Sequence, residues 1–320
     1  MPAIRRIPIC SPAAFEKIPA DGLSEKKQVL QLLINRCFER EYDKNMGQIL
    51  YHYTDYFAFH GILHDKELRV NNVLNMNDAE EMQLFMKGIF TAVYQRLVNA
   101  GETEKAAVLK GKAEELSKKR FEYSAYAACF SGFRDDAAQW ERYANRGKGV
   151  CLGFRREILE KLTGGAISLH KVYYQDNLES HPLVGEVYDL IIKSKDISQY
   201  DPSLWAKVTE AWRNSATFKH PSFASENEIR LVVMPFKADD FNVKPRFHVA
   251  KERIKKYYPL NLEEMCAKAG VTMEDLISEI IVGPQSTQSI PILQAYLRDL
   301  NLDVLAENVR HSDCPLQSKI

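Results

Sequence analysis

Two glutamates and an arginine alternate at the start of a strongly strand-like run, SENEIRLVVMPF. If this run is a strand, its period of two places Glu226, Glu228 and Arg230 on one face. The group is then either a surface ladder of ion pairs, which contributes little to stability, or a site where one carboxylate stabilises developing positive charge while Arg230 keeps it ionised. Lys219 and His220, just upstream, could add a cationic contact. The segment alone leaves both interpretations open.

A histidine lies in a second short run, ILYHYT, which has the β-branched and aromatic character of a strand. Alternation along this strand places His52 and Thr54 on one face and Tyr51 and Tyr53 on the other. A histidine at a strand end can hold a ligand hydroxyl or act as a general base. Taken alone, a histidine hydrogen-bonded within the core is the commoner case.

A third group of residues lies in the middle of the chain. Ser131 ends the apolar run SAYAACFS, at a position where a hydroxyl often meets a ligand. Trp140 and Tyr143 are three residues apart in a predicted short helix, so both rings could face one pocket, or both could fill the core. For the two rings alone, the core is the favoured interpretation.

The sequence contains no strong metal motif. Its six cysteines are scattered without a CxxC pair, which argues against a zinc ribbon or a disulfide framework. Cys129 and Cys151 lie in apolar runs, as is typical of small buried side chains. His60 and His64 have helical spacing but lack the carboxylate of an HExxH motif. We therefore expect no metal.

Composition limits the classes of function. The 320 residues are 45% hydrophobic and 27% charged, enough for a large core. The 43 basic and 43 acidic side chains cancel, so the whole chain has no positive field that would concentrate nucleic acid or an anionic membrane. No segment approaches the roughly 20 apolar residues that cross a bilayer, and the start lacks the apolar stretch of a secretory signal. We expect a cytoplasmic protein without a membrane partner and without a strong sign of nucleic-acid binding.

Strands and helices are both expected along the whole chain. The predicted strands are 49–54, 68–73, 124–131, 148–154, 166–175, 228–236, 247–252 and 277–284. The predicted helices are 25–41, 57–65, 78–119 with a break near Gly101, a short piece between 132 and 147, 187–214 and 289–302.

Only some of these strands are separated by long helices, so strict βαβ alternation fails. We therefore predict an α+β fold with a mixed, mostly antiparallel sheet and flanking helices. Residues 1–45 should form an N-terminal arm and helix, 46–310 a single α+β domain, and 311–320 a C-terminal tail.

Taken in order, six motifs resemble the bacterial domain-of-unknown-function family 2971. They are YHYT, NMNDAEE, CFSGF with QWERYANRGKGVCLGF, KVYYQ, FKHPSFASENEIRLVV and EIIVGP. The resemblance runs from about residue 50 to about residue 300, and the spaced series is more specific than any one motif. The chain departs from the family at Ala79, where proline is usual, and in the aromatic residue before E-x-E-x-R, which is less clearly placed.

The order of elements in this family is in turn similar to that of ADP-ribosyltransferases, with a histidine on the first strand and a glutamate near a later one. That similarity implies an ADP-ribosyltransferase-like fold and NAD as a substrate. His52, with Thr54 beside it, would bind the ribose hydroxyls or the adenosine side of NAD. Ser131 would support the pocket of the nicotinamide ribose, and Tyr143 or Trp140 would stack on nicotinamide.

The same resemblance gives the carboxylates a role. Glu228 or Glu226, with Arg230 beside them, would stabilise an oxocarbenium-like centre as nicotinamide leaves. The chain would then be a transferase with an unknown macromolecular acceptor, or an NAD hydrolase, acting in bacterial defence or stress. The alternative is a non-catalytic module that binds a nucleotide or another small ligand. A metal-dependent nucleic-acid enzyme is the third hypothesis, and the neutral charge counts against it.

Overall fold

The computed structural model describes residues 48–75, 79–118, 125–175, 177–199, 201–234, 244–250 and 253–316. Residues Gln48–Ile320 make up one compact unit of the chain. The arm and helix predicted for residues 1–45 lie outside the described residues.

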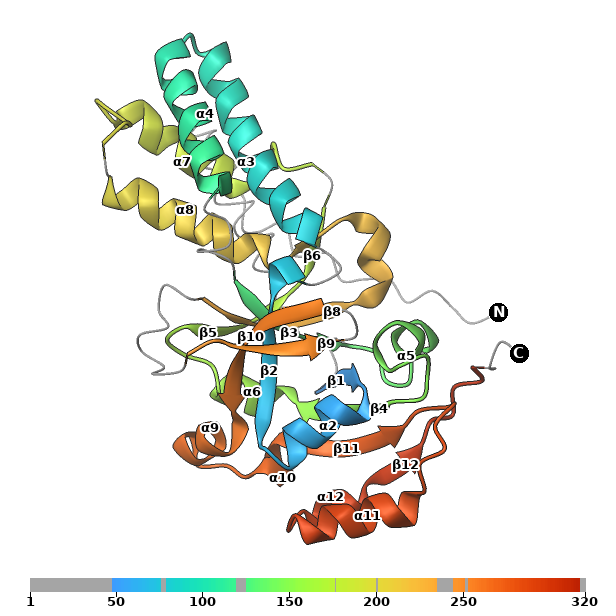
Figure 1. Cartoon of the computed structure of the whole chain (residues 1–320). Helices are drawn as coiled ribbons and strands as arrows, with labels where there is room; N and C mark the ends of the chain where they lie inside the picture. Colours follow the sequence, from blue (N-terminus) through green and yellow to red (C-terminus); the bar gives the residue numbers. More distant parts are fainter. Residues whose placement is uncertain are drawn as a thin grey trace, which may run out of the picture. The chain divides into compact units, whose positions relative to one another are not determined.

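A large mixed sheet forms the centre of this unit (Figure 1). Its strand order is β12-β11-β4-β1-β3-β2-β10-β9, and β3 also pairs with β8, which in turn pairs with β5. The strands are β1 (Ile49–Thr54), β2 (Glu67–Asn72), β3 (Tyr126–Ser131), β4 (Val150–Arg155), β5 (Ile167–Lys171), β8 (Glu228–Val233), β9 (Arg246–Ala250), β10 (Arg253–Asn261), β11 (Ile277–Val282) and β12 (Val309–His311).

The pairing within this sheet is antiparallel except between β11 and β12, which run parallel. Two short strands, β6 (Tyr173–Tyr174) and β7 (Phe218–Lys219), form a second, parallel pair. The predicted α+β class, with a mixed and mostly antiparallel sheet flanked by helices, is confirmed.

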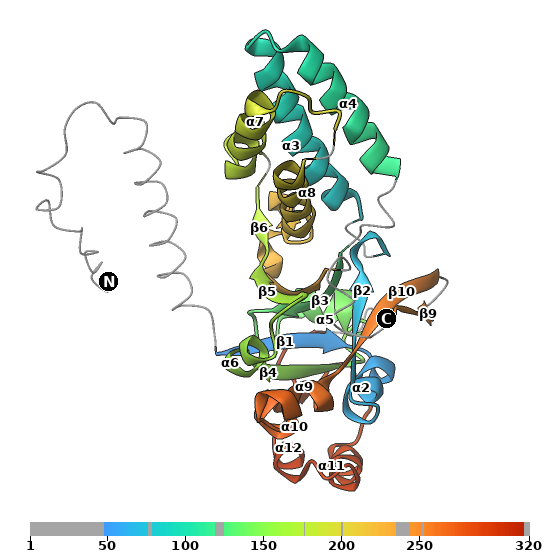
Figure 2. The same cartoon turned by 90° about the vertical axis from the view of Figure 1, so that its left-hand side faces the viewer.

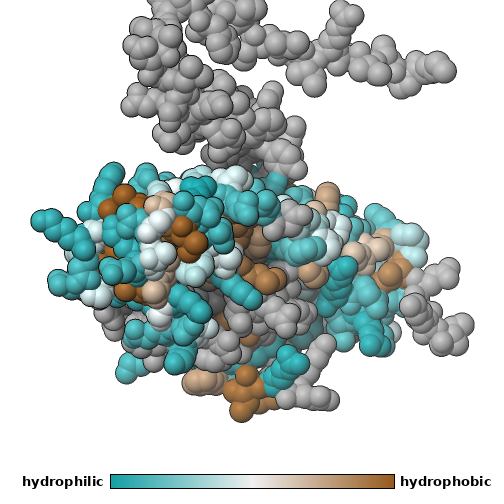
Figure 3. Space-filling model, turned by 90° about the horizontal axis from the view of Figure 1, so that it is seen from above, coloured by the Kyte–Doolittle hydropathy of each residue, from teal (hydrophilic) through white to brown (hydrophobic). Residues whose placement is uncertain are grey.

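Four helices pack together on one side of the sheet, as Figures 1 and 2 show. They are α3 (Ala79–Asn99), α4 (Thr103–Lys118), α7 (Pro182–Lys193) and α8 (Pro202–Ser215). Their shared core includes Phe85, Val187 and Trp212 and reaches Phe218 in β7. Figure 3 looks down on this side and shows some apolar side chains exposed among hydrophilic ones. The same core includes Ala127 of β3 and Val232 of β8, so these helices pack against the large sheet as well as the small one.

The helix break predicted near Gly101 is confirmed, whereas the single helix predicted over 187–214 is not. Gly101 separates α3 from α4 and has a φ of 79°, a conformation that favours glycine. This break was predicted. The continuous helical region expected over 187–214 is wrong in its middle, because α7 ends at Lys193 and α8 begins at Pro202. Proline has no backbone N–H to continue a helix but fits its first turn.

Shorter helices connect the strands. They are α2 (Tyr56–Leu63), α5 (Ala137–Tyr143), α6 (Arg156–Lys161), α9 (Leu262–Ala269), α10 (Met273–Leu276), α11 (Ile290–Asp299) and α12 (Asp303–Glu307), with the 3-10 turns η3 (Val73–Asn75) and η4 (Pro221–Glu226). The helices predicted at 57–65, 132–147 and 289–302 correspond to α2, α5 and α11. Within the described ranges, no helix is both long enough and apolar enough to cross a membrane.

Gly149 lies where the loop after α5 passes so close to β1 that no side chain fits. A Cβ there would overlap the carbonyl oxygen of Thr54 and lie 2.9 Å from that of Ala144. We expect Gly149→Ala to lower the free energy of unfolding by about 1–3 kcal/mol, because backbone atoms would have to move. Urea denaturation measures this change.

The matched control is Gly111→Ala in α4, where a Cβ meets nothing within 4 Å. This change should stabilise the protein by about 0.5–1 kcal/mol, because alanine favours a helix over glycine. Equal effects of the two substitutions would contradict the close approach at Gly149.

Candidate functional site

A small cavity lies where β1 and β3 meet α5, η4 and the start of β8. Its volume is about 140 Å³. The residues that line it include His52, Ser131, Gln139, Tyr143, Glu226 and Glu228. Five of these six were predicted site residues, and they come from three segments that are far apart in the sequence. The structure therefore brings most of the predicted site together.

Three predicted residues do not line this cavity: Thr54, Trp140 and Arg230. Trp140 is fully buried, its ring centroid lies 4.9 Å from that of Tyr53, and its indole N–H donates to Asp135 at 2.7 Å. The alternative that this ring fills the core is the one observed. Tyr143, three residues along α5, is the ring that reaches the cavity.

His52 is a neutral imidazole with one nitrogen engaged. Its Nδ1 lies 2.8 Å from the carbonyl oxygen of Cys129. A carbonyl can only accept, so Nδ1 carries the proton and Nε2 is left as the acceptor of the ring. The ring packs against Phe130 and Phe154, and burial lowers the pKa of His52 below its usual value. The histidine can therefore accept a hydrogen bond from a hydroxyl of a ligand.

Glu228 is held by two cations below the surface. Arg230 contacts both of its oxygens, with Nε 2.8 Å from Oε1 and Nη2 3.0 Å from Oε2. The Nζ of Lys219 lies 3.1 Å from Oε2. Glu228 and Arg230 are only 6% and 3% exposed, so the surface-ladder interpretation is wrong.

These contacts decide the charge of Glu228. Burial by itself raises the pKa of its carboxyl, but the charge and hydrogen bonds of Arg230, the charge of Lys219 and the thiol of Cys129 together lower that pKa to about 2. Glu228 is therefore ionised at neutral pH. Burial and the charge of Glu228 raise the pKa of the Cys129 thiol well above its usual value, so the thiol stays protonated and donates to the carboxylate.

Glu226 contacts one of these two cations, Lys219, from a different element of the chain. It ends η4 and precedes the strand, and Asn227 between the two glutamates has a left-handed backbone with φ 42°. The predicted alternation of Glu226 and Glu228 along one strand is therefore wrong. The Nζ of Lys219 nevertheless lies 2.7 Å from Oε2 of Glu226, so this lysine bridges the two carboxylates.

The turn that carries Glu226 is fixed by the end of β3. The Ser131 hydroxyl donates to the carbonyl oxygen of Glu226 at 3.2 Å, and the side-chain amide of Gln139 donates to the same oxygen at 3.3 Å. The backbone N–H of Gly132 donates to the carbonyl oxygen of Asn227 at 3.0 Å. Ser131 thus positions the turn, and its hydroxyl proton is used in this hydrogen bond.

Two residues that complete the site were not predicted. Arg142 places Nη1 2.7 Å from Oε1 of Glu226, and Gln139 holds the carbonyl of that turn. Tyr143 also donates to Oε1 of Glu226, at 3.2 Å. The spacing of Gln139, Arg142 and Tyr143 was a usable signal, because residues three and four apart share a face of a helix.

The charges around the cavity favour an anionic ligand. The cations Lys219, Arg142 and Arg230 outnumber the carboxylates Glu226 and Glu228 by one. Arg142 is 47% exposed in its side chain, whereas Lys219 is 1% exposed. Arg142 is therefore the cation of this group that is best placed to meet a ligand from solvent. His220, by contrast, is exposed and caps η4 through the N–H of Ser222.

The spaced pair of histidines lies outside this cavity. His60 and His64 stack on the exposed side of α2, and together with Asp65 they offer potential metal ligands. The Nδ1 of His60 bonds the hydroxyl of Tyr296, and that of His64 bonds Asp65.

The described cysteines are free thiols: Cys129, Cys151, Cys266 and Cys314. Cys151 is fully buried, as its apolar run predicted, whereas Cys129 is only half-buried.

Comparison of the chain with family models found one match, to a family described as protein of unknown function DUF2971, over residues 139–231. That range contains most of α5, Lys219, both glutamates and Arg230, but neither His52 nor Ser131. Comparisons with curated proteins and with solved structures found no match. The resemblance to DUF2971 is therefore confirmed, with its family model matching residues 139–231 of this chain.

Proposed function

We propose that this cavity binds the reacting end of NAD and that the protein transfers ADP-ribose to a macromolecular acceptor or to water. One observation carries the proposal. A histidine that can accept a ligand hydroxyl, an aromatic ring and two buried carboxylates line one cavity, although they come from distant segments. These are His52, Tyr143, Glu226 and Glu228.

The chemistry assigns each group a step. The bond between C1′ of the ribose and the nicotinamide nitrogen breaks, and nicotinamide leaves with the electron pair as a neutral base. The ribose becomes oxocarbenium-like, and the ionised Glu228 stabilises its positive charge. Nε2 of His52 accepts a hydrogen bond from a ribose hydroxyl and holds the sugar in place. The acceptor then attacks C1′ and loses its proton to solvent, and water as the acceptor gives hydrolysis.

The size and charge of the site are compatible with partial enclosure of a dinucleotide. A volume of about 140 Å³ is below the roughly 300–1,000 Å³ of pockets that enclose a drug-sized ligand. Only the nicotinamide end of NAD would be enclosed, and the diphosphate would lie at the rim. Arg142, which is half exposed, would bind the diphosphate there.

A second candidate function is a nucleotide-binding module without catalysis. One observation favours it: all four carboxylate oxygens of Glu226 and Glu228 already have a partner in Lys219, Arg142, Tyr143 or Arg230. Carboxylates neutralised in this way stabilise a cationic sugar less than free ones. In this alternative they position the cations that attract the phosphates.

The test is to incubate the full chain with NAD, alone and with cell lysate, and to measure released nicotinamide by chromatography. Thermal unfolding with and without NAD measures binding in parallel. Nicotinamide release is the result expected of the enzyme. Stabilisation by NAD without release under any condition would favour the binding module, and the absence of both effects would contradict both functions.

A further inference from the structure

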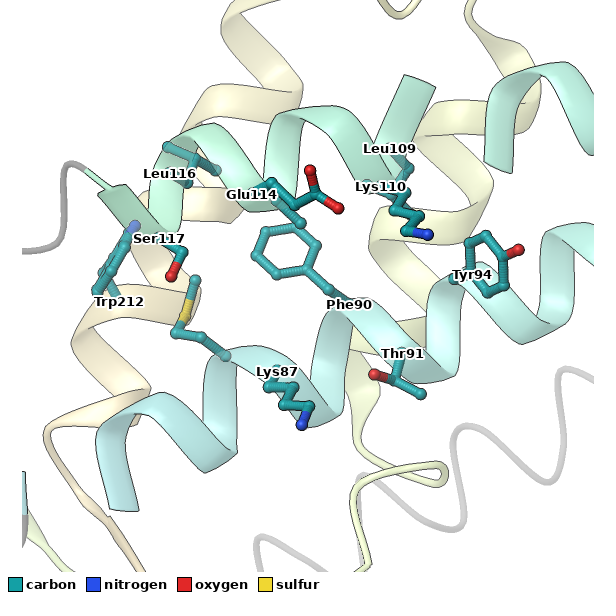
Figure 4. Close-up of a pocket in the computed structure, with 12 residues that line it drawn as sticks. Lys87, Phe90, Thr91, Tyr94, Leu109, Lys110, Glu114, Leu116, Ser117 and Trp212 are labelled. Carbon is teal, nitrogen blue, oxygen red and sulfur yellow. The ribbon is translucent and has the colours of Figure 1, made fainter. Parts of the chain in front are cut away.

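A larger pocket lies between α3, α4 and α8, among the helices and away from the sheet (Figure 4). Its volume is about 480 Å³, within the roughly 300–1,000 Å³ of pockets that hold small organic ligands. Apolar side chains form much of its wall, including Met86, Phe90, Leu109, Leu116 and Trp212. The described residues that line it include none of those that line the cavity at β1.

The indole of Trp212 offers an unused hydrogen-bond donor in this pocket. The residue is 5% exposed, and its Nε1 is buried without a hydrogen-bond partner among the described residues. Buried donors are nearly always paired, so this N–H is suited to donate to a ligand in the pocket. Figure 4 shows the indole nitrogen at the end of the pocket beside Ser117. A ligand that carries an oxygen atom would supply the acceptor.

The charged residues at the pocket have an excess of positive charge. Lys87 and Lys110 line it together with one carboxylate, Glu114. In the part of the chain that the structure describes, neither lysine forms an ion pair. Figure 4 shows the two lysines on different helices, with the ring of Phe90 between them. An anionic group is therefore favoured over a cationic one.

We propose that this pocket binds a small amphipathic carboxylate. Its apolar body lies over Phe90 and Leu109, a carboxylate oxygen accepts the N–H of Trp212, and Lys87 and Lys110 attract its charge. The apolar wall supplies affinity through burial, and the indole with the lysines supplies selectivity for an anion with an acceptor oxygen. This site is independent of the proposed NAD site.

The probe is decanoate below its micellar concentration, titrated into the full chain by calorimetry. Decyltrimethylammonium has a hydrocarbon tail of the same length and the opposite charge, and serves as the comparison. We expect saturable binding of one decanoate per chain and at least about tenfold weaker binding of the cation. Equal affinity for the two probes, or no binding of decanoate, would overturn the proposal.

Variants locate the binding on the protein. Ala113→Trp fills the pocket and should abolish decanoate binding, whereas Ala107→Trp changes an exposed alanine of α4 outside the pocket and should not. Trp212→Phe keeps an aromatic ring but removes the donor, and should weaken binding about tenfold.

The surface double variant Lys87→Met with Lys110→Met should reduce the preference for decanoate over the cation. Unchanged binding in Ala113→Trp, or an unchanged preference in the double variant, would contradict the assignment.

Discussion

Glu228→Gln is expected to lower the rate of nicotinamide release by about 10²–10³-fold, the usual loss when one group that stabilises transition-state charge is removed. Glutamine keeps the shape of the side chain but carries no negative charge. In the proposed mechanism that charge faces the ribose as nicotinamide leaves, and the low pKa of about 2 means that it is present at neutral pH. The measurement is nicotinamide release at saturating NAD.

The comparison must separate catalysis from folding, because Glu228 also neutralises Arg230 and Lys219. Circular dichroism and thermal unfolding identify conditions in which the variant is folded, and rates are compared there. Glu264→Gln, at an exposed position of α9, is the matched control and should leave the rate unchanged. Normal release by folded Glu228→Gln would remove Glu228 from the mechanism, and Glu226→Gln would then test the neighbouring carboxylate.

Arg230→Met is expected to lower the free energy of unfolding by about 3–5 kcal/mol, the typical cost when one partner of a buried ion pair is removed. Arg230 is 3% exposed, contacts both oxygens of Glu228 and donates to the carbonyl oxygen of Ala216 at 2.7 Å. Without it, Lys219 is the remaining cation beside Glu228, and it is already shared with Glu226. Equilibrium denaturation in urea measures the change.

The matched control is Lys268→Met, which breaks an exposed pair with Glu264 in α9. The two side chains of that pair are 75% and 61% exposed, so the loss should stay below about 0.5 kcal/mol. If both substitutions cost the same, the network around Glu228 would be no more than a surface contact.

Arg230→Met should also change how the free energy of unfolding depends on pH. The pKa of Glu228 is about 2 in the folded protein, below its ordinary value of 4.5. Because the pKa is lower in the folded state, ionised Glu228 contributes its full stabilisation above about pH 4.5, and this contribution is lost as the pH falls towards 2. Arg230→Met raises the pKa of Glu228 in the folded state, so the difference in stability between wild type and variant should shrink between pH 5 and pH 3. A constant difference would contradict the charge pairing.

Local sequence patterns were sufficient for many of the helices and strands. The runs at β1 and β8 match their predicted positions because β-branched and aromatic residues favour strands. The periodic segments at α3, α4 and α11 also match, because burial of one face of a helix imposes a period on the sequence. β10 (Arg253–Asn261) was missed. Its run RIKKYYPLN combines charges with Pro259, and it is a strand because it pairs with β2 and β9.

The candidate site was predictable in its residue types and only partly in its arrangement. His52, Ser131, Tyr143 and Glu228 were identified as side chains capable of binding or catalysis, and the structure places them around one cavity. The sequence could not separate Tyr143 from Trp140. Both rings lie on one short helix, and the choice between core and cavity depends on how α5 packs against β1.

What the sequence by itself determined is the fold class and most of the side chains that line the candidate site, because residue types and local periodicity can be read directly from it. Tertiary structure alone decided that Glu226 leaves the strand, that Lys219 bridges the two glutamates, and that these charges are buried. The energy of an ion pair depends on its removal from water. Segments far apart in the chain bury these ion pairs, so a local sequence pattern cannot predict the burial.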